Sequence, residues 1–260
     1  MDLELQDKVA LVFGAGGGLG SAIADVLATE GAKIGLADIN KEALDAATER
    51  VGPQTDTAAV QWDLSDLDSI PDNIAAVEDK LGPIDIVVNM TGGPPPTPIS
   101  GQSRSAWSEH FEAMVLSVIG IVDAVVPGMR ERGWGRIITS TSSGVVAPIP
   151  NLGLSNALRS TLVGWNKTLA REVGPYGITS NIIIPGRIAT ARITQLDRAK
   201  ATREGRSVED VAAESVASIP VGRYGRPSEY ADLVAFLASQ RASYITGSMI
   251  RVDGGLIASV

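Results

Sequence analysis

The chain alternates two patterns of hydrophobic positions. Short runs of consecutive apolar residues are separated by longer stretches in which apolar residues recur every three or four positions. An unbroken apolar run is typical of a strand buried on both faces, whereas spacings of three and four indicate a helix with one apolar side. The runs fall at 9–13, 33–37, 60–64, 84–89, 136–140, 177–184 and 249–252, and the main helical patterns at 67–80, 106–130, 152–173 and 228–239. This unbroken alternation predicts one α/β domain over residues 1–260, a doubly wound parallel sheet of about seven strands with helices on both faces.

Glycines crowd the junction between the first predicted strand and the helical pattern that follows it. Glycine lets the backbone take unusual angles and approach a ligand without a Cβ in the way. A helix that begins there presents free N–H groups and its positive dipole end to an anion. The order of strand, glycine turn and helix therefore predicts a site for the diphosphate of a dinucleotide. The residues of this predicted turn are Gly14, Gly16, Gly17, Gly18, Leu19 and Gly20.

Carboxylates follow the next two predicted strands. Asp38, with Ile39 after it, stands about 20 residues beyond the glycines, where an acid accepts hydrogen bonds from the adenosine ribose hydroxyls. Because a carboxylate repels a 2′-phosphate, Asp38 predicts NAD as the cofactor in preference to NADP. Asp63, followed by Leu64, ends the third predicted strand, where the amino group of adenine could dock.

Small or polar residues also end the later strands. In a parallel sheet all strands end at one edge, and ligands of doubly wound sheets bind there. Residues 90–96 hold glycines and consecutive prolines, which predicts a rigid loop over the cofactor, and residues 190–222, rich in charge, predict a lid over the substrate. The residues predicted at this edge from the later strand ends are Asn89, Ser142, Pro185 and Gly186.

Composition narrows the classes of function. The net charge of −8, without a cluster of lysine and arginine, argues against nucleic acid as a partner. The sequence has no cysteine and a single histidine, His110, so we expect no disulfide, no thiolate catalysis and no metal site. Residues 1–4 are not an apolar leader, and no run approaches the roughly 18 apolar residues of a membrane span. We therefore expect no membrane partner and a cytoplasmic location.

These motifs resemble those of the short-chain dehydrogenase/reductase family, over essentially the whole chain. Gly14-x-x-x-Gly18-x-Gly20 is similar to the family's glycine motif, with Phe13 where threonine is usual. Residues 89–92 are similar to its Asn-Asn-Ala-Gly segment, 185–190 to the segment that holds the nicotinamide amide, and 253–255 to its C-terminal Asp-Gly-Gly signature. The resemblance implies that Thr91, Gly92, Ile188 and Thr190 also contact the cofactor. The resemblance implies a Rossmann fold, a nicotinamide cofactor and redox chemistry on a carbonyl or alcohol.

The family's catalytic residues are asparagine, serine, tyrosine and lysine, and here the resemblance matches only the serine, at Ser142. The tyrosine position falls on Ser155, the lysine position on Arg159 and the asparagine position on Met114. Residues 154–159, together with 92–96, resemble a divergent subgroup described as β-ketoacyl-ACP-reductase-like. For that subgroup the resemblance implies an imperfect set of catalytic residues and an unsettled substrate.

The replacements change the acid–base chemistry. A serine hydroxyl is a far weaker acid than the tyrosine phenol, whose pKa is about 10, and arginine keeps its proton. Loss of a positioned general acid costs about 10²–10⁴ in rate. Ser142, Ser155 and Arg159 could instead form an oxyanion site, because residues four apart share one face of a helix. Arg187 would add a second cation and favour an anionic substrate, such as a carboxylate or a phosphorylated carrier, unless it pairs with a carboxylate of the lid.

Three functions remain open. The first is an NAD(H)-dependent oxidoreductase for a small carbonyl or alcohol. The second is an NAD(H)-binding pseudoenzyme, a sensor or scaffold, because the cofactor motifs are kept beside replaced catalytic residues. The third is a non-redox lyase or dehalogenase-like enzyme, although dehalogenases of this fold keep the tyrosine and lose the glycine loop. The helices predicted at 106–130 and 152–173 carry more apolar positions than one sheet face can bury. The family resemblance implies that this excess forms a four-helix seam between subunits, in a homodimer or homotetramer.

Overall fold

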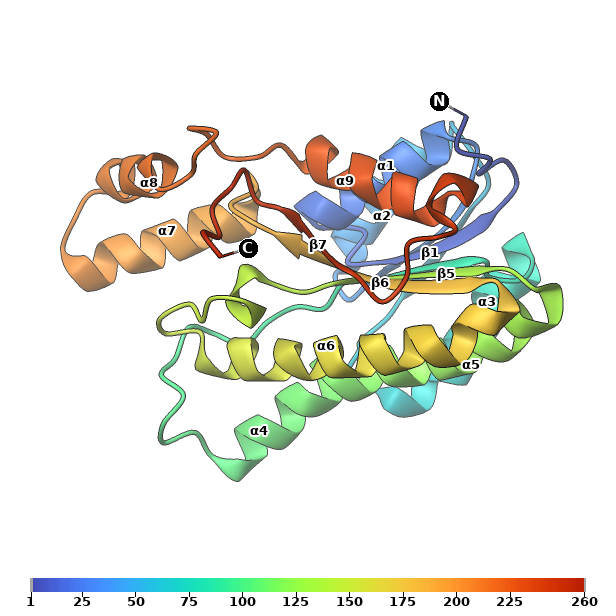
Figure 1. Cartoon of the computed structure of the whole chain (residues 1–260), viewed down its shortest axis with the longest axis horizontal. Helices are drawn as coiled ribbons and strands as arrows, with labels where there is room; N and C mark the ends of the chain where they lie inside the picture. Colours follow the sequence, from blue (N-terminus) through green and yellow to red (C-terminus); the bar gives the residue numbers. More distant parts are fainter. Residues whose placement is uncertain (1, 260) are drawn as a thin grey trace.

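Seven parallel strands lie side by side in the order β3-β2-β1-β4-β5-β6-β7 in the computed structural model, which describes residues 2–259 (Figure 1). The order reverses between β1 and β4, the point at which doubly wound sheets bind their ligands. The fold is therefore the predicted Rossmann sheet. The strands are β1 (Val9–Phe13), β2 (Lys33–Asp38), β3 (Thr57–Gln61), β4 (Ile86–Asn89), β5 (Gly135–Ser140), β6 (Ile178–Pro185) and β7 (Met249–Val252).

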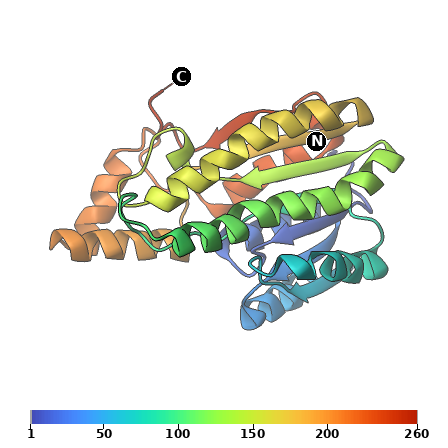
Figure 2. The ribbon, with the colours of Figure 1, turned by 90° about the horizontal axis from the view of Figure 1, so that it is seen from below.

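Helices cover both faces of the sheet, as Figures 1 and 2 show. Successive strand residues point to opposite faces. On β1, Ala10 packs into the core with α1 and α9, whereas Leu11 packs into the core with α3 and α5. Burial on both faces explains why β1 reads as an unbroken apolar run. One face carries α1 (Gly18–Thr29), α2 (Lys41–Val51) and α9 (Pro227–Ala238), and the other α3 (Ile70–Leu81), α5 (Ser117–Arg132) and α6 (Gly153–Val173).

Two predicted elements differ from the structure. The third strand is β3, at 57–61 instead of 60–64, so Asp63 and Leu64 lie in the loop after it. The long helix comprises α4 (Arg104–Phe111), a π-helical turn (Glu112–Leu116) and α5, and it continues through Pro127, a residue type that usually kinks or breaks a helix. The irregularity falls instead at the π-helical turn, which contains Met114. A turn of this kind holds an extra residue and occurs often at functional sites.

The segment predicted as a lid folds into two helices, α7 (Ala191–Glu204) and α8 (Val208–Ala217), which extend beyond the sheet in Figure 1. Hydroxyl side chains cap both N-termini: Thr190 accepts from the N–H of Ile193 at 3.4 Å, and Ser207 from that of Asp210 at 3.0 Å. Such caps satisfy backbone donors that the helix itself leaves free. The segment is therefore helical and capped, and its role as a lid over the substrate stays a prediction.

The helix from Arg104 to Arg132 has the length and composition of a membrane span, with an 18-residue window of mean hydropathy 1.8. The expectation that no segment would meet these criteria was wrong. Within the fold, 44% of that window is buried, and the helix packs against α3, α6 and β5. Apolar core helices of globular proteins satisfy the same two criteria, because they too bury a broad hydrophobic face.

The glycine turn after β1 depends on a close approach between two backbone segments. Gly14 has a φ of +63°, in the left-handed region that favours glycine. A Cβ built on Gly20, in the first turn of α1, would lie 2.2 Å from the carbonyl oxygen of Gly14. Only a residue without a side chain allows α1 to begin this close to the end of β1, which places the N-terminus of the helix at the sheet edge.

We predict that Gly20→Ala lowers the free energy of unfolding by about 1–3 kcal/mol, the usual cost of overpacking, because its methyl group must displace the Gly14 carbonyl. Chemical denaturation measures this change. Gly164→Ala is the matched control, since a Cβ on this glycine of α6 meets no atom within 4 Å. Alanine is the better helix former, so the control should be neutral or stabilising by up to about 1 kcal/mol. Equal stability of the two variants would contradict this account of the turn.

Candidate active site

A cavity of about 1030 Å³ lies at the carboxyl edge of the sheet, between the strand ends and α7. Most of the predicted site residues line it. They are Gly14, Gly17, Gly18, Leu19, Asp38, Thr91, Gly92, Ser142, Ser155, Arg159, Pro185, Gly186, Arg187, Ile188 and Thr190. The predicted residues that do not line it are Gly16, Gly20, Ile39, Asp63, Leu64 and Asn89.

Asp38 stands at the end of β2, where two backbone N–H groups fix its carboxylate. Its Oδ2 accepts from the N–H of Gly16, and its Oδ1 from that of Asn40, each at 2.9 Å. Each carboxylate oxygen can accept more than one hydrogen bond. Capacity therefore remains on Asp38 for two ribose hydroxyls, beside the glycine turn that would hold the diphosphate.

Buried hydroxyl groups at the strand ends give an independent test of fit for a dinucleotide. The Oγ1 atoms of Thr91 and Thr141, both on residues that line the cavity, are buried without a hydrogen-bond partner among residues 2–259. A buried hydroxyl left unpaired costs about 1–3 kcal/mol, so polar groups of a ligand are expected beside them. A Cβ on Gly18 would lie 2.9 Å from Cγ2 of Thr190, so the start of α7 lies directly over the glycine turn. These features fit a nicotinamide dinucleotide.

Ile39 and Asp63, two of the predicted cofactor contacts, lie outside this cavity. The Ile39 side chain is 60% exposed. The Oδ1 atom of Asp63 accepts from the backbone N–H of Ser65 at 2.8 Å and from its hydroxyl at 2.7 Å, and these bonds lower the pKa of Asp63. Asp63 thus holds the turn after β3, and its contact with adenine stays a prediction.

Two serine hydroxyls face the substrate end of the cavity. Oγ of Ser142, just after β5, accepts from the N–H of Gly144 at 3.1 Å, which leaves its own hydrogen free to donate. Ser155, in α6, is buried and makes no side-chain hydrogen bond to any residue from 2 to 259. Both hydroxyls are therefore available to a substrate oxygen.

The Arg159 guanidinium is buried one helical turn after Ser155. Its Nη2 donates to the carbonyl oxygens of Thr91 at 3.1 Å and Gly92 at 2.8 Å, and its Nη1 to that of Ser140 at 3.4 Å. It therefore ties the loop after β4 to the end of β5. Burial lowers the pKa of Arg159 to about 10, so the group stays charged at neutral pH.

The cavity has no phenol in its lining. The sequence has four tyrosines, and none of them is among the cavity residues. Tyr230 is fully buried on α9, where its hydroxyl bonds to Oγ of Ser140 at 2.7 Å and burial raises its pKa. Met114, at the family's asparagine position, lies in an apolar cluster with Leu154 and Leu158. The positions of the family's tyrosine and asparagine thus hold neither a phenol nor an amide for moving a proton.

Arg187 is not a free second cation. Its Nη1 forms an ion pair with Oδ1 of Asp197 at 2.7 Å, and Asp197 is buried on α7. Oδ2 of Asp197 accepts from the hydroxyl of Tyr224 at 2.7 Å. The alternative given above, pairing with a lid carboxylate, is what the structure contains.

Sequence reasoning missed a set of cavity residues on α7. Arg192, Leu196, Lys200 and Arg203 all line the cavity, and their spacing of four, four and three places them on one side of the helix. The sequence contains this helical spacing, but charged residues at positions 197, 198 and 204 made it hard to tell which side of the helix would face a cavity. Among residues 2–259 no group of three or more acidic or histidine side chains could hold a metal ion.

The chain is similar to known reductases over its whole length. Residues 14–257 match the family model described as enoyl-(acyl carrier protein) reductase. The 3-oxoacyl-[acyl-carrier-protein] reductase FabG of Vibrio cholerae is 34% identical over 256 residues, which cover 98% of this chain and 99% of that protein. The L-sorbose reductase of Gluconobacter frateurii, solved with NADPH and L-sorbose, is 30% identical with a TM-score of 0.94 over 100% of both chains.

A second solved structure binds the other nicotinamide cofactor. An NAD⁺-bound xylitol dehydrogenase has a TM-score of 0.91 at 27% identity, over 97% of this chain and 100% of that one. The family model itself spans the glycine turn, the strand ends and the helices that line the cavity. The chain therefore belongs to the short-chain dehydrogenase/reductase family of oxidoreductases.

Proposed function

We propose that this chain transfers a hydride between NAD(H) and a small carbonyl or alcohol substrate at a site formed by Ser142, Ser155 and Arg159. The observation that carries the proposal is a single cavity. It holds the glycine turn and Asp38 at one end and these three side chains at the other. A dinucleotide that lies across the strand ends would bring its nicotinamide to the serines.

The preference for NAD rests on Asp38. Solved relatives of this chain bind either NADPH or NAD⁺, so the choice depends on the residues of this chain. Two backbone N–H groups hold the Asp38 carboxylate in place, and a fixed negative charge disfavours a 2′-phosphate. The next basic residue, Lys41, forms an ion pair with Asp45 at 2.8 Å and leaves Asp38 unneutralised.

The residues of the site can stabilise an oxyanion even without a phenol. When bound, the nicotinamide supplies or accepts the hydride. Ser142 and Ser155 donate hydrogen bonds to the substrate oxygen, and the Arg159 charge, held in a buried position, favours the negative charge that develops there. The proton that completes reduction comes from solvent water through these hydroxyls, so we expect a slow reaction.

A pseudoenzyme is the second candidate, and two observations favour it. No tyrosine lines the cavity, and the asparagine position is the buried apolar Met114. A chain of this kind would bind NAD(H) through Asp38 and the glycine turn, but would not oxidise or reduce it. The two candidates share the cofactor and differ in turnover.

We also propose a homo-oligomer formed through α4, α5 and α6. Trp107, Phe111 and Trp165 are only partly buried at one apolar cluster between these helices. Leu116, on the π-helical turn, is 38% exposed. A second copy would cover this surface, as isologous contacts do in most soluble dimers.

For the cofactor, we predict that Asp38→Ala weakens NADH binding by about 10–100-fold, the usual worth of hydrogen bonds to a charged group, and reduces discrimination against NADPH. Titration calorimetry with both cofactors measures the two affinities. Glu49→Ala, which removes an exposed acid of α2 and leaves the Lys41–Asp45 pair intact, is the control and should leave both unchanged. Tighter binding of NADPH than of NADH by the wild type would contradict the assignment.

For the chemistry, we predict that Ser155→Tyr/Arg159→Lys increases single-turnover oxidation of bound NADH by carbonyl compounds about 10²–10⁴-fold. The wild-type rate should be independent of pH from about 6 to about 9, because Arg159 remains charged throughout this range. Stopped-flow absorbance measures both.

Ala157→Tyr is the control for this experiment, since it adds a phenol on an exposed position of α6 and should have no effect. If the wild type does not oxidise NADH and the double variant does, the proposed enzyme is rejected in favour of the pseudoenzyme. Release of halide or water without a change in nicotinamide absorbance would instead support a non-redox reaction.

For assembly, we predict that Leu116→Asp converts the oligomer to a smaller species, because it places a charge on an apolar contact surface. Size-exclusion chromatography with light scattering gives the mass. Ile39→Asp, at an exposed apolar position between β2 and α2, should leave the mass unchanged. A monomeric wild type would refute the proposed assembly.

A further inference from the structure

The substrate end of the cavity carries an excess of positive charge, although the whole chain has a net charge of −8. Only two acids line the cavity, and one of them, Asp38, is at the dinucleotide end. The other is Glu204, near the end of α7. The cations of the lining are Arg159, Arg187, Arg192, Lys200 and Arg203. A cavity with this balance attracts an anion.

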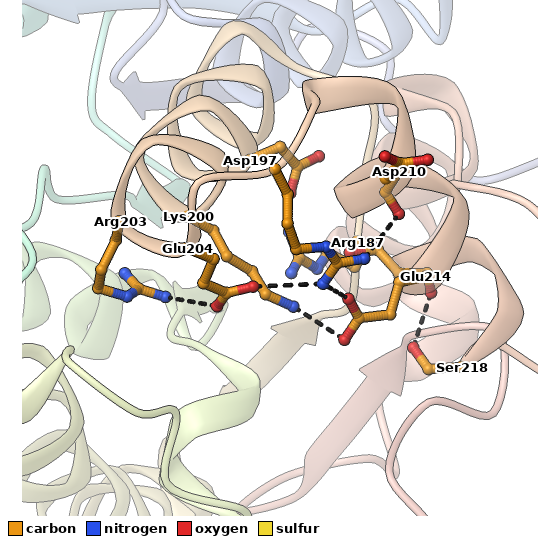
Figure 3. Close-up of polar contacts among 10 residues, drawn as sticks. Arg187, Asp197, Lys200, Arg203, Glu204, Asp210, Glu214 and Ser218 are labelled. Atoms are coloured by element: carbon orange, nitrogen blue, oxygen red, sulfur yellow. Dashed lines mark hydrogen bonds and ion pairs between the residues drawn. The ribbon is translucent and has the colours of Figure 1, made fainter.

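Three of these cations already form ion pairs with neighbouring acids. Arg187 pairs with Asp197, as described above. Lys200 pairs with Glu214 at 3.0 Å, and Arg203 with Glu204 at 3.2 Å. Figure 3 shows the network between α7 and α8 to which the last two pairs belong. Arg206, between the two helices, shares both Glu204 and Glu214, so these three cations and two acids bind one another and join α7 to α8.

Arg159 and Arg192 are the remaining cations, and neither forms an ion pair with any acid among residues 2–259. Arg159 spends its Nη2 hydrogens on carbonyl oxygens. Arg192 donates only to the carbonyl of Pro94, at 3.4 Å. Since a guanidinium has five N–H donors, Arg192 keeps most of its own for a ligand.

The two guanidiniums converge on one place beside Gly93. A Cβ on this glycine would lie 3.7 Å from Nη2 of Arg159, 3.8 Å from Nη2 of Arg192 and 4.0 Å from Oγ of Ser155. Because residue 93 has no side chain, this space is open to the cavity. Two like charges brought together without an acid repel each other, and an anion between them removes that repulsion.

We propose that the substrate carries a carboxylate, which binds Arg192 in the space beside Gly93, with Arg159 and Ser155 behind it. This inference rests on the proposed function and names its substrate class, a short oxo acid or hydroxy acid. The planar fork of arginine matches the two oxygens of a carboxylate. Ile193 and Leu196 of α7 also line the cavity and provide an apolar wall for a short carbon chain.

The test uses protein saturated with NADH and three pairs of probes: acetate, pyruvate and acetoacetate, each against its neutral amide. Saturation-transfer NMR measures the binding of each probe. We expect at least one carboxylate to bind while its amide does not. Arg192→Gln should weaken that carboxylate about tenfold or more, and Arg192→Lys should restore part of the affinity. Arg198→Gln is the matched control, since Arg198 is exposed on the same helix outside the cavity lining.

The affinity for NADH is measured on every variant, because the cofactor diphosphate is the other anion near α7. If Arg192→Gln lowers the affinity for NADH and not that for the carboxylate, Arg192 serves the cofactor and the inference is wrong. It is also wrong if the amides bind as well as the acids, or if no carboxylate binds. If the wild type does not bind NADH, the proposed function fails, and the same probes with the unloaded protein decide the inference separately.

Discussion

A buried guanidinium holds the edge of the sheet in the arrangement on which the site depends. Arg159 binds carbonyl oxygens of Thr91, Gly92 and Ser140, from the segments that follow β4 and end β5. Burial of a charge without a carboxylate is costly, and hydrogen bonds to several carbonyl dipoles offset that cost. The loop that contains Gly93 and the β5 end that precedes Ser142 are therefore placed by the same side chain.

The same bonds explain what an arginine can do at this position. The resemblance implies a lysine there that holds the nicotinamide ribose and lowers the pKa of a tyrosine. Lysine is a compact charge, whereas a guanidinium is a rigid fork that bridges separate acceptors. Here the fork is directed to the protein backbone, and Ser155 has no acidic proton whose pKa could be lowered usefully. Arg159 thus contributes position and charge, and the geometry of the cavity survives without the usual proton donor.

Much of the fold was readable from the sequence because β1 and its neighbours are buried on both faces. The run from Val9 to Phe13 has no polar interruption, and its strand was predicted residue for residue. At the edge formed by β3, an apolar run no longer marked the bounds of the strand. Only Ala58 is buried in β3, and Trp62, buried just after it, shifted the apparent apolar run toward the C-terminus.

The candidate site was predictable where it depends on local chain chemistry and not where it depends on distant partners. Glycines, strand ends and the position of Asp38 follow from local order. The ion pair of Arg187 does not follow from local order. Its partner Asp197 lies in the second turn of α7 and is itself held by the hydroxyl of Tyr224. The role of Arg192 could not be predicted for the same reason. What sets Arg192 apart is that it forms no ion pair with any acid among residues 2–259, and the spacing of residues along the chain does not reveal this.

The missing phenol and the two unpaired arginines are parts of one electrostatic balance. Without a strong proton donor beside the substrate oxygen, the negative charge that forms on reduction persists until a proton arrives from water. Fixed positive charge must stabilise it during that time. A substrate that also carries a carboxylate brings a second negative charge to the same place. Arg159 and Arg192 supply two positive charges there, whereas the other cations of the cavity form ion pairs with acids. The replacement that weakens acid catalysis and the arrangement that favours an anionic substrate are therefore compatible in one site.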